Sequence, residues 1–199
     1  MISRIVVATR NPDKLREIQN KFGGLPIQLL SLADFPSLRE VEEDQPDLLG
    51  NAIKKAVEIN RATGLPALAD DTGLEVEALH GAPGVLSARY SGLGATYDSN
   101  CRKLLNEMRD VSAELRQARF RTVICLRTSD GLHCVEGVLD GTIAFEKRGA
   151  QGFGYDPIFV LPDGRTLAEL ELSEKNRVSH RAQALEKLAK LLTALFPNP

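Results

Sequence analysis

The 199-residue sequence contains no tryptophan, only two methionines and few aromatic residues, namely three tyrosines and seven phenylalanines. It also lacks an excess of charge, because 25 Lys and Arg against 27 Asp and Glu give a formal net charge of −2. Proteins that bind nucleic acids or membrane surfaces are distinctly basic, so neither is expected as a partner, although a local cationic pocket is compatible with this balance. No apolar run approaches ~18 residues, which excludes a transmembrane helix. Residues 1–8 become polar too soon for a signal peptide and predict a first strand instead.

Cysteine and histidine are scarce, with three of each, and neither shows the close spacing of a zinc site. An odd number of cysteines without a C-x-x-C pair disfavours a disulfide framework and is typical of a protein in the reducing cytosol. We therefore expect a cytoplasmic protein in which any bound metal is held by carboxylates. The residues concerned are Cys101, Cys125, Cys134, His80, His133 and His180.

The remaining composition, 43% hydrophobic and 26% charged, is that of an ordinary globular protein, and we expect a single domain over residues 1–199. Strand-like and helix-like segments alternate, which favours the α/β class over a helical bundle or a β-sandwich. The patterns predict strands at 5–8, 27–32 and 74–78, helices at 12–22, 48–62, 99–108 and 179–195, and a hairpin of 117–126 with 132–140.

The segment from Thr9 to Lys14 joins the end of the first strand to the start of a helix. Asn11 is a good N-cap and Pro12 suits the first helical position. Free backbone N–H groups and the positive end of the helix dipole would favour an anion here, and the Lys14 ammonium could reach a bound phosphate. The alternative interpretation is a capped helix with a solvated lysine.

A second candidate is Asp70-Asp71-Thr72-Gly73, which follows a short apolar run at 67–69. Adjacent carboxylates are costly at the end of a buried strand unless water or a cation accompanies them. Mg²⁺ takes oxygen ligands, commonly one or two carboxylates together with phosphates and waters, and Glu42 or Glu43 could supply a second carboxylate. An Asx-type turn is the competing interpretation of the aspartates, and a solvated loop is that of the glutamates.

Aromatic and basic side chains gather in the last quarter of the sequence. The glycine-rich loop at 149–157 carries Phe153 and Tyr155, whose rings could stack on a base, or Phe153 could fill the core of a structural turn. Arg181 lies in line with Leu185 on the apolar face of the last helix, where it needs a partner or extends past the helix end. Cations, carboxylates and aromatic rings together suit a magnesium-bound nucleoside triphosphate.

Several short motifs occur in one order along most of the chain. They are Thr9-x-Asn11-x-x-Lys14, Asn51-Ala52-x-x-Lys55-Ala56, Asp70-Asp71-Thr72-Gly73-Leu74, Gly81-Ala82-Pro83-Gly84 with Ser87-Ala88-Arg89-Tyr90-Ser91-Gly92, Gly152-Phe153-Gly154-Tyr155-Asp156-Pro157, and Ser179-His180-Arg181. With this set the chain resembles the inosine triphosphate pyrophosphatase family. The resemblance implies Mg²⁺-dependent hydrolysis of nonstandard purine nucleoside triphosphates (ITP, dITP and XTP) to the monophosphate and pyrophosphate, which cleanses the nucleotide pool.

The resemblance also implies an elongated, two-lobed α/β fold with a long central mixed β-sheet flanked by helices, an active-site cleft between the lobes, and a homodimer. Asp71 would be the general base and a metal ligand. Glu42 would be the other metal carboxylate, although the adjacent Glu43 leaves the register open. The substrate-binding residues it implies are Thr9, Asn11, Lys14 and Lys55 for the triphosphate, Thr72 beside them, and Phe153, Gly154, Tyr155, Asp156, Lys175, His180 and Arg181 around the nucleoside.

Base choice follows from the donors in that set. Arg181 only donates hydrogen bonds and His180 can donate from either ring nitrogen, so a pocket made from them favours the 6-keto oxygen of inosine and xanthosine over the 6-amino group of adenine. Two other functions stay open. One is a pyrophosphatase for another nucleotide class, such as pyrimidine or modified triphosphates. The other is a nucleotide sensor without turnover, which the presence of Asp71 disfavours because a sensor needs no base.

Overall fold

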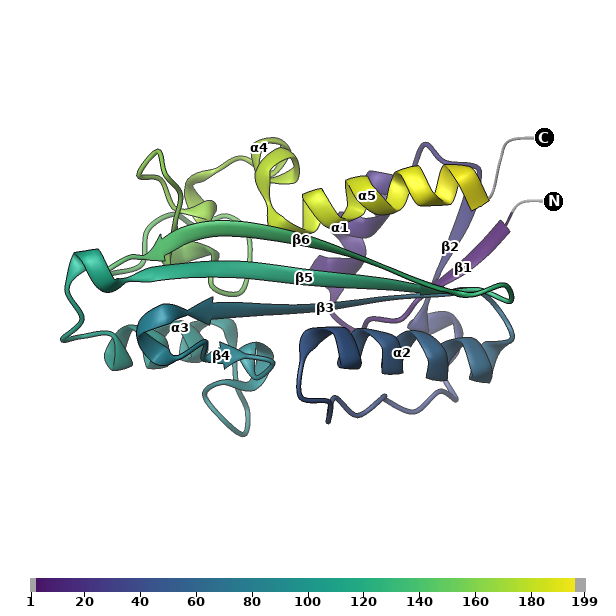
Figure 1. The fold of residues 1–199 in the computed structure, drawn as a ribbon, viewed down its shortest axis with the longest axis horizontal. Coiled ribbons are helices and arrows are strands. Elements are labelled where there is room, and N and C mark those ends of the chain that lie inside the picture. The colour runs from purple at the N-terminus through teal and green to yellow at the C-terminus, as the bar shows by residue number, and fades with distance from the viewer. Residues whose placement is uncertain (1–2, 196–199) are drawn as a thin grey trace. The chain divides into compact units, whose positions relative to one another are not determined.

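The computed structural model describes residues 3–195 as an α/β protein (Figure 1). Contacts within this part of the chain divide it into two compact units, each assembled from separate stretches of sequence. The first unit contains residues 3–71, 122–137 and 182–195, and the second contains residues 72–121 and 138–181. Each unit has its own apolar core, and the single domain expected over 1–199 stays a prediction.

The strands form one mixed sheet, as expected for the α/β class. Among the described residues the strand order is β2-β1-β3-β5-β6-β7, with β4 paired to β3. β1 is parallel to β2 and β3, whereas β4 is antiparallel to β3 and β7 to β6. The strands are β1 (Ser3–Val7), β2 (Ile27–Ser31), β3 (Ala67–Val76), β4 (Pro83–Gly84), β5 (Gln117–Arg127), β6 (Leu132–Ile143) and β7 (Phe159–Val160).

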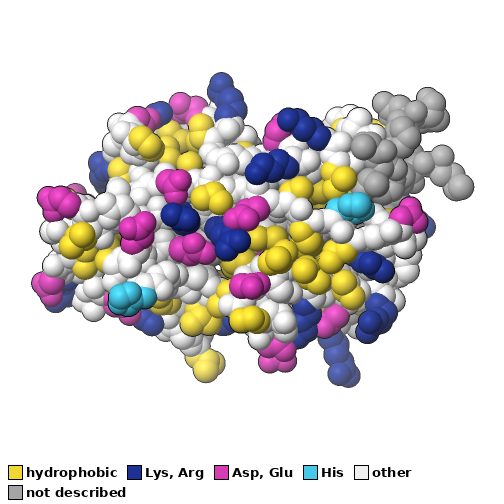
Figure 2. Space-filling model, viewed as in Figure 1, with side chains coloured by type: hydrophobic (Ala, Val, Ile, Leu, Met, Phe, Trp, Pro, Cys, Tyr) yellow, Lys and Arg dark blue, Asp and Glu magenta, His cyan; other side chains and the backbone are white. Residues whose placement is uncertain are grey.

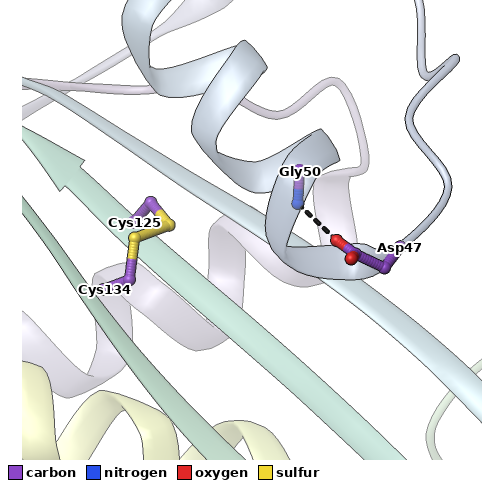
Figure 3. The surroundings of a disulfide bond; sticks show 4 residues. All are labelled: Asp47, Gly50, Cys125 and Cys134. Atoms are coloured by element: carbon purple, nitrogen blue, oxygen red, sulfur yellow. Dashed lines mark hydrogen bonds between the residues drawn. A yellow bond between two sulfur atoms is a disulfide. The ribbon is translucent and has the colours of Figure 1, made fainter.

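Five α-helices lie within residues 3–195, and none of them is long and apolar enough to cross a membrane. Polar side chains cap the first two of these helices. Asn11 caps α1, and the Asp47 side chain accepts a hydrogen bond from the Gly50 N–H at 2.7 Å to begin α2 (Figure 3). The helices are α1 (Pro12–Phe22), α2 (Leu48–Thr63), α3 (Tyr97–Glu107), α4 (Leu172–Val178) and α5 (His180–Leu195).

The first unit builds its core on the parallel strands. Successive side chains of a strand face opposite sides, so Ile5 and Val7 of β1 share one face and Val6 lies on the other. The first of these faces packs against α1 and α5, while α2 lies on the opposite side of the strands (Figure 1). The cluster contains Ile5, Val7, Ile18, Phe22, Leu68, Ile124, Leu126, Ala184, Leu185, Leu188 and Leu192.

The second unit builds its core between α3, the far ends of the long strands and the loop that carries the predicted nucleoside residues. Its cluster contains Leu74, Val76, Cys101, Leu104, Met108, Ala118, Phe120, Ile143, Tyr155, Ile158, Phe159, Leu167 and Leu170.

On the face shown in Figure 2, positive and negative side chains are interspersed, and no broad field of one sign covers that face.

One local interpretation was wrong, and one helix was not predicted. Asp70 to Gly73 is not a turn, because β3 runs unbroken from Ala67 to Val76. The predicted helix at 179–195 is present as α5, and the extended backbone of Ser179 (φ −65°, ψ 155°) separates it from α4. α4 had no strong apolar periodicity and was not predicted.

A disulfide bond between Cys125 and Cys134 corrects the conclusion drawn from cysteine spacing (Figure 3). Thr128 N–H donates to the Gly131 carbonyl at 2.9 Å, which fixes the register of the β5–β6 hairpin. Counting back from that pair, Cys125 and Cys134 face each other at a position without backbone hydrogen bonds, where strands approach most closely. Their Cα atoms are 4.2 Å apart. Cys101 is a buried free thiol.

Candidate active site

Two lysine–aspartate pairs meet at β3 in the first unit. The Lys14 ammonium, from the first turn of α1, lies 2.6 Å from Asp70 Oδ1, and the Lys55 ammonium, from α2, lies 2.7 Å from Asp71 Oδ1. Neighbouring strand residues point to opposite faces, so each aspartate meets the helix that covers its own face. Both lysines also donate to the Asp70 carbonyl, at 3.4 and 2.9 Å.

Lys55 joins a second carboxylate to this cluster. Its ammonium lies 2.8 Å from Glu43 Oε1, so it sits between Glu43 and Asp71. Burial alone would lower the pKa of Lys55, but attraction from Asp71 and Glu43 outweighs burial and raises it. Burial raises the pKa of Asp71, and the opposing attraction from Lys55 and Lys14 offsets this only in part. The structure therefore brings Glu43 to Asp71, whereas Glu42 is exposed.

The start of α1 differs from the predicted anion pocket. Asn11 Oδ1 accepts hydrogen bonds from the N–H groups of Asp13 (2.9 Å) and Lys14 (3.3 Å), and Pro12 has no N–H. The Asn11 N–H is itself directed to Thr9 Oγ1 at 3.2 Å. The expectation of free N–H groups was wrong because the N-cap residue satisfies them. Within this segment, the Lys14 ammonium is the group that could bind an anion.

Asn51 is a polar residue of the same unit that was recognised only as part of a motif. It is 1% exposed and lies one helical turn before Lys55. Asn51 Oδ1 accepts the Gln45 N–H at 3.0 Å, which ties the acidic segment before α2 to the helix. Asn51 Nδ2 has no hydrogen-bond partner within the described residues, although a buried donor normally has one. Its burial next to the lysine cluster is not apparent from sequence.

In the second unit, Asp156 and Lys175 form a buried ion pair. Asp156 Oδ2 lies 2.7 Å from the Lys175 ammonium and also accepts the Phe153 N–H at 2.8 Å. Both side chains are only 4% exposed. Gly152 makes this arrangement possible, because a Cβ there would lie 2.1 Å from Asp156 Oδ2 and because its φ is +74°. Asp156 thus positions both the loop and the lysine.

Arg181 and His180 lie at the start of α5. Arg181 is 2% exposed, its Nη2 donates to Thr72 Oγ1 at 2.9 Å, and its guanidinium lies 5.6 Å from the centre of the Phe153 ring. His180 stacks on Phe120, with ring centres 4.6 Å apart. Arg181 therefore has a partner in the second unit and does not extend past the helix end into solvent.

The aromatic residues of the glycine-rich loop take different positions. Tyr155 is 4% exposed in the core and donates its hydroxyl to the Ser87 carbonyl at 2.9 Å, so its ring is not available for stacking at the surface. Phe153 is partly exposed, and the Lys175 ammonium lies 4.4 Å from its ring centre. Tyr97 of α3, which was not singled out in the sequence, lies 5.8 Å from Phe153 between ring centres.

Comparison with known proteins identifies the family to which this chain belongs. The sequence model of the Ham1 family matches residues 5–191. A protein of Geobacter sulfurreducens named dITP/XTP pyrophosphatase is 52% identical over 189 residues, which cover 94% of this chain and 95% of that protein. A dITP/XTP pyrophosphatase of Elusimicrobium minutum is 49% identical over 193 residues, covering 94% and 98%.

Solved structures agree with this assignment. A HAM1 protein from Coxiella burnetii superposes with a TM-score of 0.90 at 43% identity, covering 97% of this chain and all of that one. The Ham1 protein of Staphylococcus aureus gives a TM-score of 0.88 at 35% identity, covering 97% and 100%. The chain belongs to the Ham1 family.

Proposed function

We propose that this protein is a nucleoside triphosphate pyrophosphatase that hydrolyses nonstandard purine nucleoside triphosphates (ITP, dITP and XTP) to the monophosphate and pyrophosphate. The observation that carries the proposal is the cluster of Lys14 and Lys55 with Asp70, Asp71 and Glu43 at β3. The relatives named dITP/XTP pyrophosphatase, identical at about half of their positions, support the same reaction. Such an enzyme would cleanse the nucleotide pool.

The two lysines are proposed to bind the triphosphate, together with Thr9 and Asn11. Each ammonium is now paired with a carboxylate, so phosphate oxygens would take over part of that pairing when substrate binds. Charge-assisted hydrogen bonds from lysine to phosphate would then stabilise the negative charge that develops on the leaving pyrophosphate.

The donor set fits a hard divalent cation such as Mg²⁺. Glu43 and Asp71 both turn an oxygen toward one cationic group, the Lys55 ammonium, and Glu42 lies beside Glu43 in the chain. Mg²⁺ is commonly held by one or two carboxylates together with substrate phosphates and waters, and Glu43 and Asp71 could supply those carboxylates. When bound, Mg²⁺ would neutralise phosphate charge and acidify water.

Asp71 is proposed as the general base that takes a proton from the attacking water. A carboxylate is a weak base at its ordinary pKa, and burial raises the pKa of Asp71, which strengthens it. The water would attack the α-phosphorus, form the new P–O bond of the monophosphate and expel pyrophosphate. Asp71 ends one segment of the first unit and Thr72, a proposed substrate contact, begins the second unit, so these two residues are adjacent in sequence.

The nucleoside is proposed to bind in the second unit. Phe153 would stack on the base, Arg181 and His180 would donate to the 6-keto oxygen, and Asp156 with Lys175 would hold the loop that carries Phe153 and Gly154. Tyr155 would contribute through the core rather than by stacking. We further propose a cytoplasmic homodimer, with the nucleotide as ligand and neither nucleic acid nor membrane as partner.

The experiment is an assay of ITP hydrolysis with and without divalent cation. In Mg²⁺ the protein should release IMP and pyrophosphate in equal amounts, excess EDTA should remove activity, and added Mg²⁺ should restore it. Zinc should not be required, because no His/Cys cluster exists to hold it within residues 3–195. Full activity in excess EDTA would contradict the carboxylate-held metal, and no release of pyrophosphate in Mg²⁺ would contradict the proposed function.

A further inference from the structure

Phe153 has a second aromatic neighbour that does not belong to its own loop. Tyr97, the first residue of α3, lies with its ring centre 5.8 Å from that of Phe153 and its plane tilted by 42°. This separation and tilt are ordinary for an attractive aromatic pair. Tyr155, the other aromatic residue of the loop, is buried and bonded to the Ser87 carbonyl, so Tyr97 is the aromatic side chain placed to meet a ligand beside Phe153.

The neighbours of the Phe153 ring differ in charge and in exposure. Lys175 and Arg181 are 3% and 2% exposed, and their cationic groups lie 4.4 and 5.6 Å from the ring centre, so buried positive charge lies beside the ring. Tyr97 is 42% exposed and lies toward solvent. A base that enters from solvent to stack on Phe153 would therefore meet Tyr97, the exposed aromatic neighbour of that ring.

The distance between the Tyr97 and Phe153 rings determines whether a base can fit between them. A flat base with a ring in contact on each side needs about 7–8 Å between the two rings, because carbon atoms in contact are about 3.5–4.0 Å apart. The Tyr97 and Phe153 rings are closer than this, so one of them must move when a base enters. Phe153 is held by its N–H bond to the buried Asp156, whereas Tyr97 is half exposed at a helix end.

We propose that Tyr97 is a movable cover of the base site, which lies against Phe153 without nucleotide and swings outward to form the second wall of a base sandwich. This inference rests on the proposed function and deepens it by adding a binding residue from α3. Stacking on a ring is tolerant of base type, so Tyr97 would contribute affinity for purines in general, while Arg181 selects among them.

Steady-state kinetics of Tyr97→Ala with ITP provide the first test, with inorganic triphosphate as a competitive inhibitor that has no base. The inference expects KM for ITP to rise about 5- to 100-fold with little change in kcat, an unchanged inhibition constant for inorganic triphosphate, and rescue of most of the loss in Tyr97→Phe. A KM within twofold of wild type, or an equal weakening of inorganic triphosphate, would overturn it.

Intrinsic fluorescence provides a second test that does not depend on turnover. The chain has no tryptophan, so its emission comes from three tyrosines. Inosine monophosphate should quench part of this emission in wild type, and the quenching should disappear in Tyr97→Phe. Tyr90→Phe is the control, because the Tyr90 hydroxyl bonds to Glu107, and this variant should be quenched like wild type. Quenching that persists in Tyr97→Phe, or no quenching in wild type, would contradict the sandwich. If the wild type releases no pyrophosphate but shows this pattern, the proposed function fails and the base site stands.

Discussion

Two adjacent aspartates carry different partners because a strand turns them to opposite faces. Asp70 pairs with Lys14 from α1, and Asp71 pairs with Lys55 from α2, which also holds Glu43. The sequence identified all of these residues as candidates, since their types suit a metal and a triphosphate. It did not identify the pairing, because the pairing depends on β3 continuing through a segment whose Asp and Gly content is typical of turns.

Replacing the proposed base should remove turnover while the fold survives. In Asp71→Asn the amide cannot accept the proton from water, so we expect kcat for ITP to fall at least about 100-fold, with an unchanged circular dichroism spectrum. Asp44→Asn is a matched control, because Asp44 pairs with the neighbouring Lys54 at 2.8 Å in an exposed position, and it should behave like wild type. Turnover of Asp71→Asn within tenfold of wild type would refute the role of Asp71.

Arg181 is the residue on which base choice is proposed to depend. Its guanidinium donates to Thr72 and lies near the Phe153 ring, and a guanidinium can only donate hydrogen bonds, which suits a keto oxygen rather than an amino group. Arg181→Ala should lower kcat/KM for ITP far more than for ATP, measured on both substrates with both proteins. The exposed Arg177→Ala, next to α5, should change neither. Equal proportional losses on ITP and ATP would mean that Arg181 binds phosphate or supports structure and reads no base.

At the scale of elements, the β5–β6 hairpin was predicted with nearly correct bounds because its alternating strands flank a short Ser129-Asp130 turn. The disulfide within it was missed, although the turn register would have placed Cys125 opposite Cys134. A small, odd number of cysteines argues against a framework of several disulfides. It does not exclude a single disulfide between two neighbouring strands. α4 escaped prediction because its seven residues show no clear apolar stripe.

The disulfide predicts how many thiols react in the native, unfolded and reduced protein. Air-oxidised protein should show no reactive thiol when native, one when unfolded and three when unfolded and reduced. Cys101 is silent in the native protein because burial raises its pKa to about 12, which leaves almost no thiolate at neutral pH. Reduction should also lower the free energy of unfolding by about 2.5 kcal/mol, as expected for closing so short a loop. Three thiols in the unreduced, unfolded protein would contradict the bond.

At the scale of the whole molecule, the sequence predicted the α/β class, most helices and strands, and the family. Periodicity and caps are local signals, and they sufficed for α1 and α2. The environment of single side chains was less accessible. The burial of Tyr155, the exposure of Tyr97 and the burial of Asn51 depend on contacts between distant segments, which no local pattern encodes.

Selective cleavage of nonstandard purine triphosphates between the α- and β-phosphates is the central property proposed for this protein. The measurement is kcat/KM and product identity for ITP, XTP, ATP, GTP and a pyrimidine triphosphate, with ³¹P NMR of each reaction run in ¹⁸O-labelled water. We predict values for ITP and XTP at least about 100-fold above that for ATP, with label in the monophosphate and none in pyrophosphate. Similar values for ATP and ITP, or release of the diphosphate and inorganic phosphate, would contradict the account.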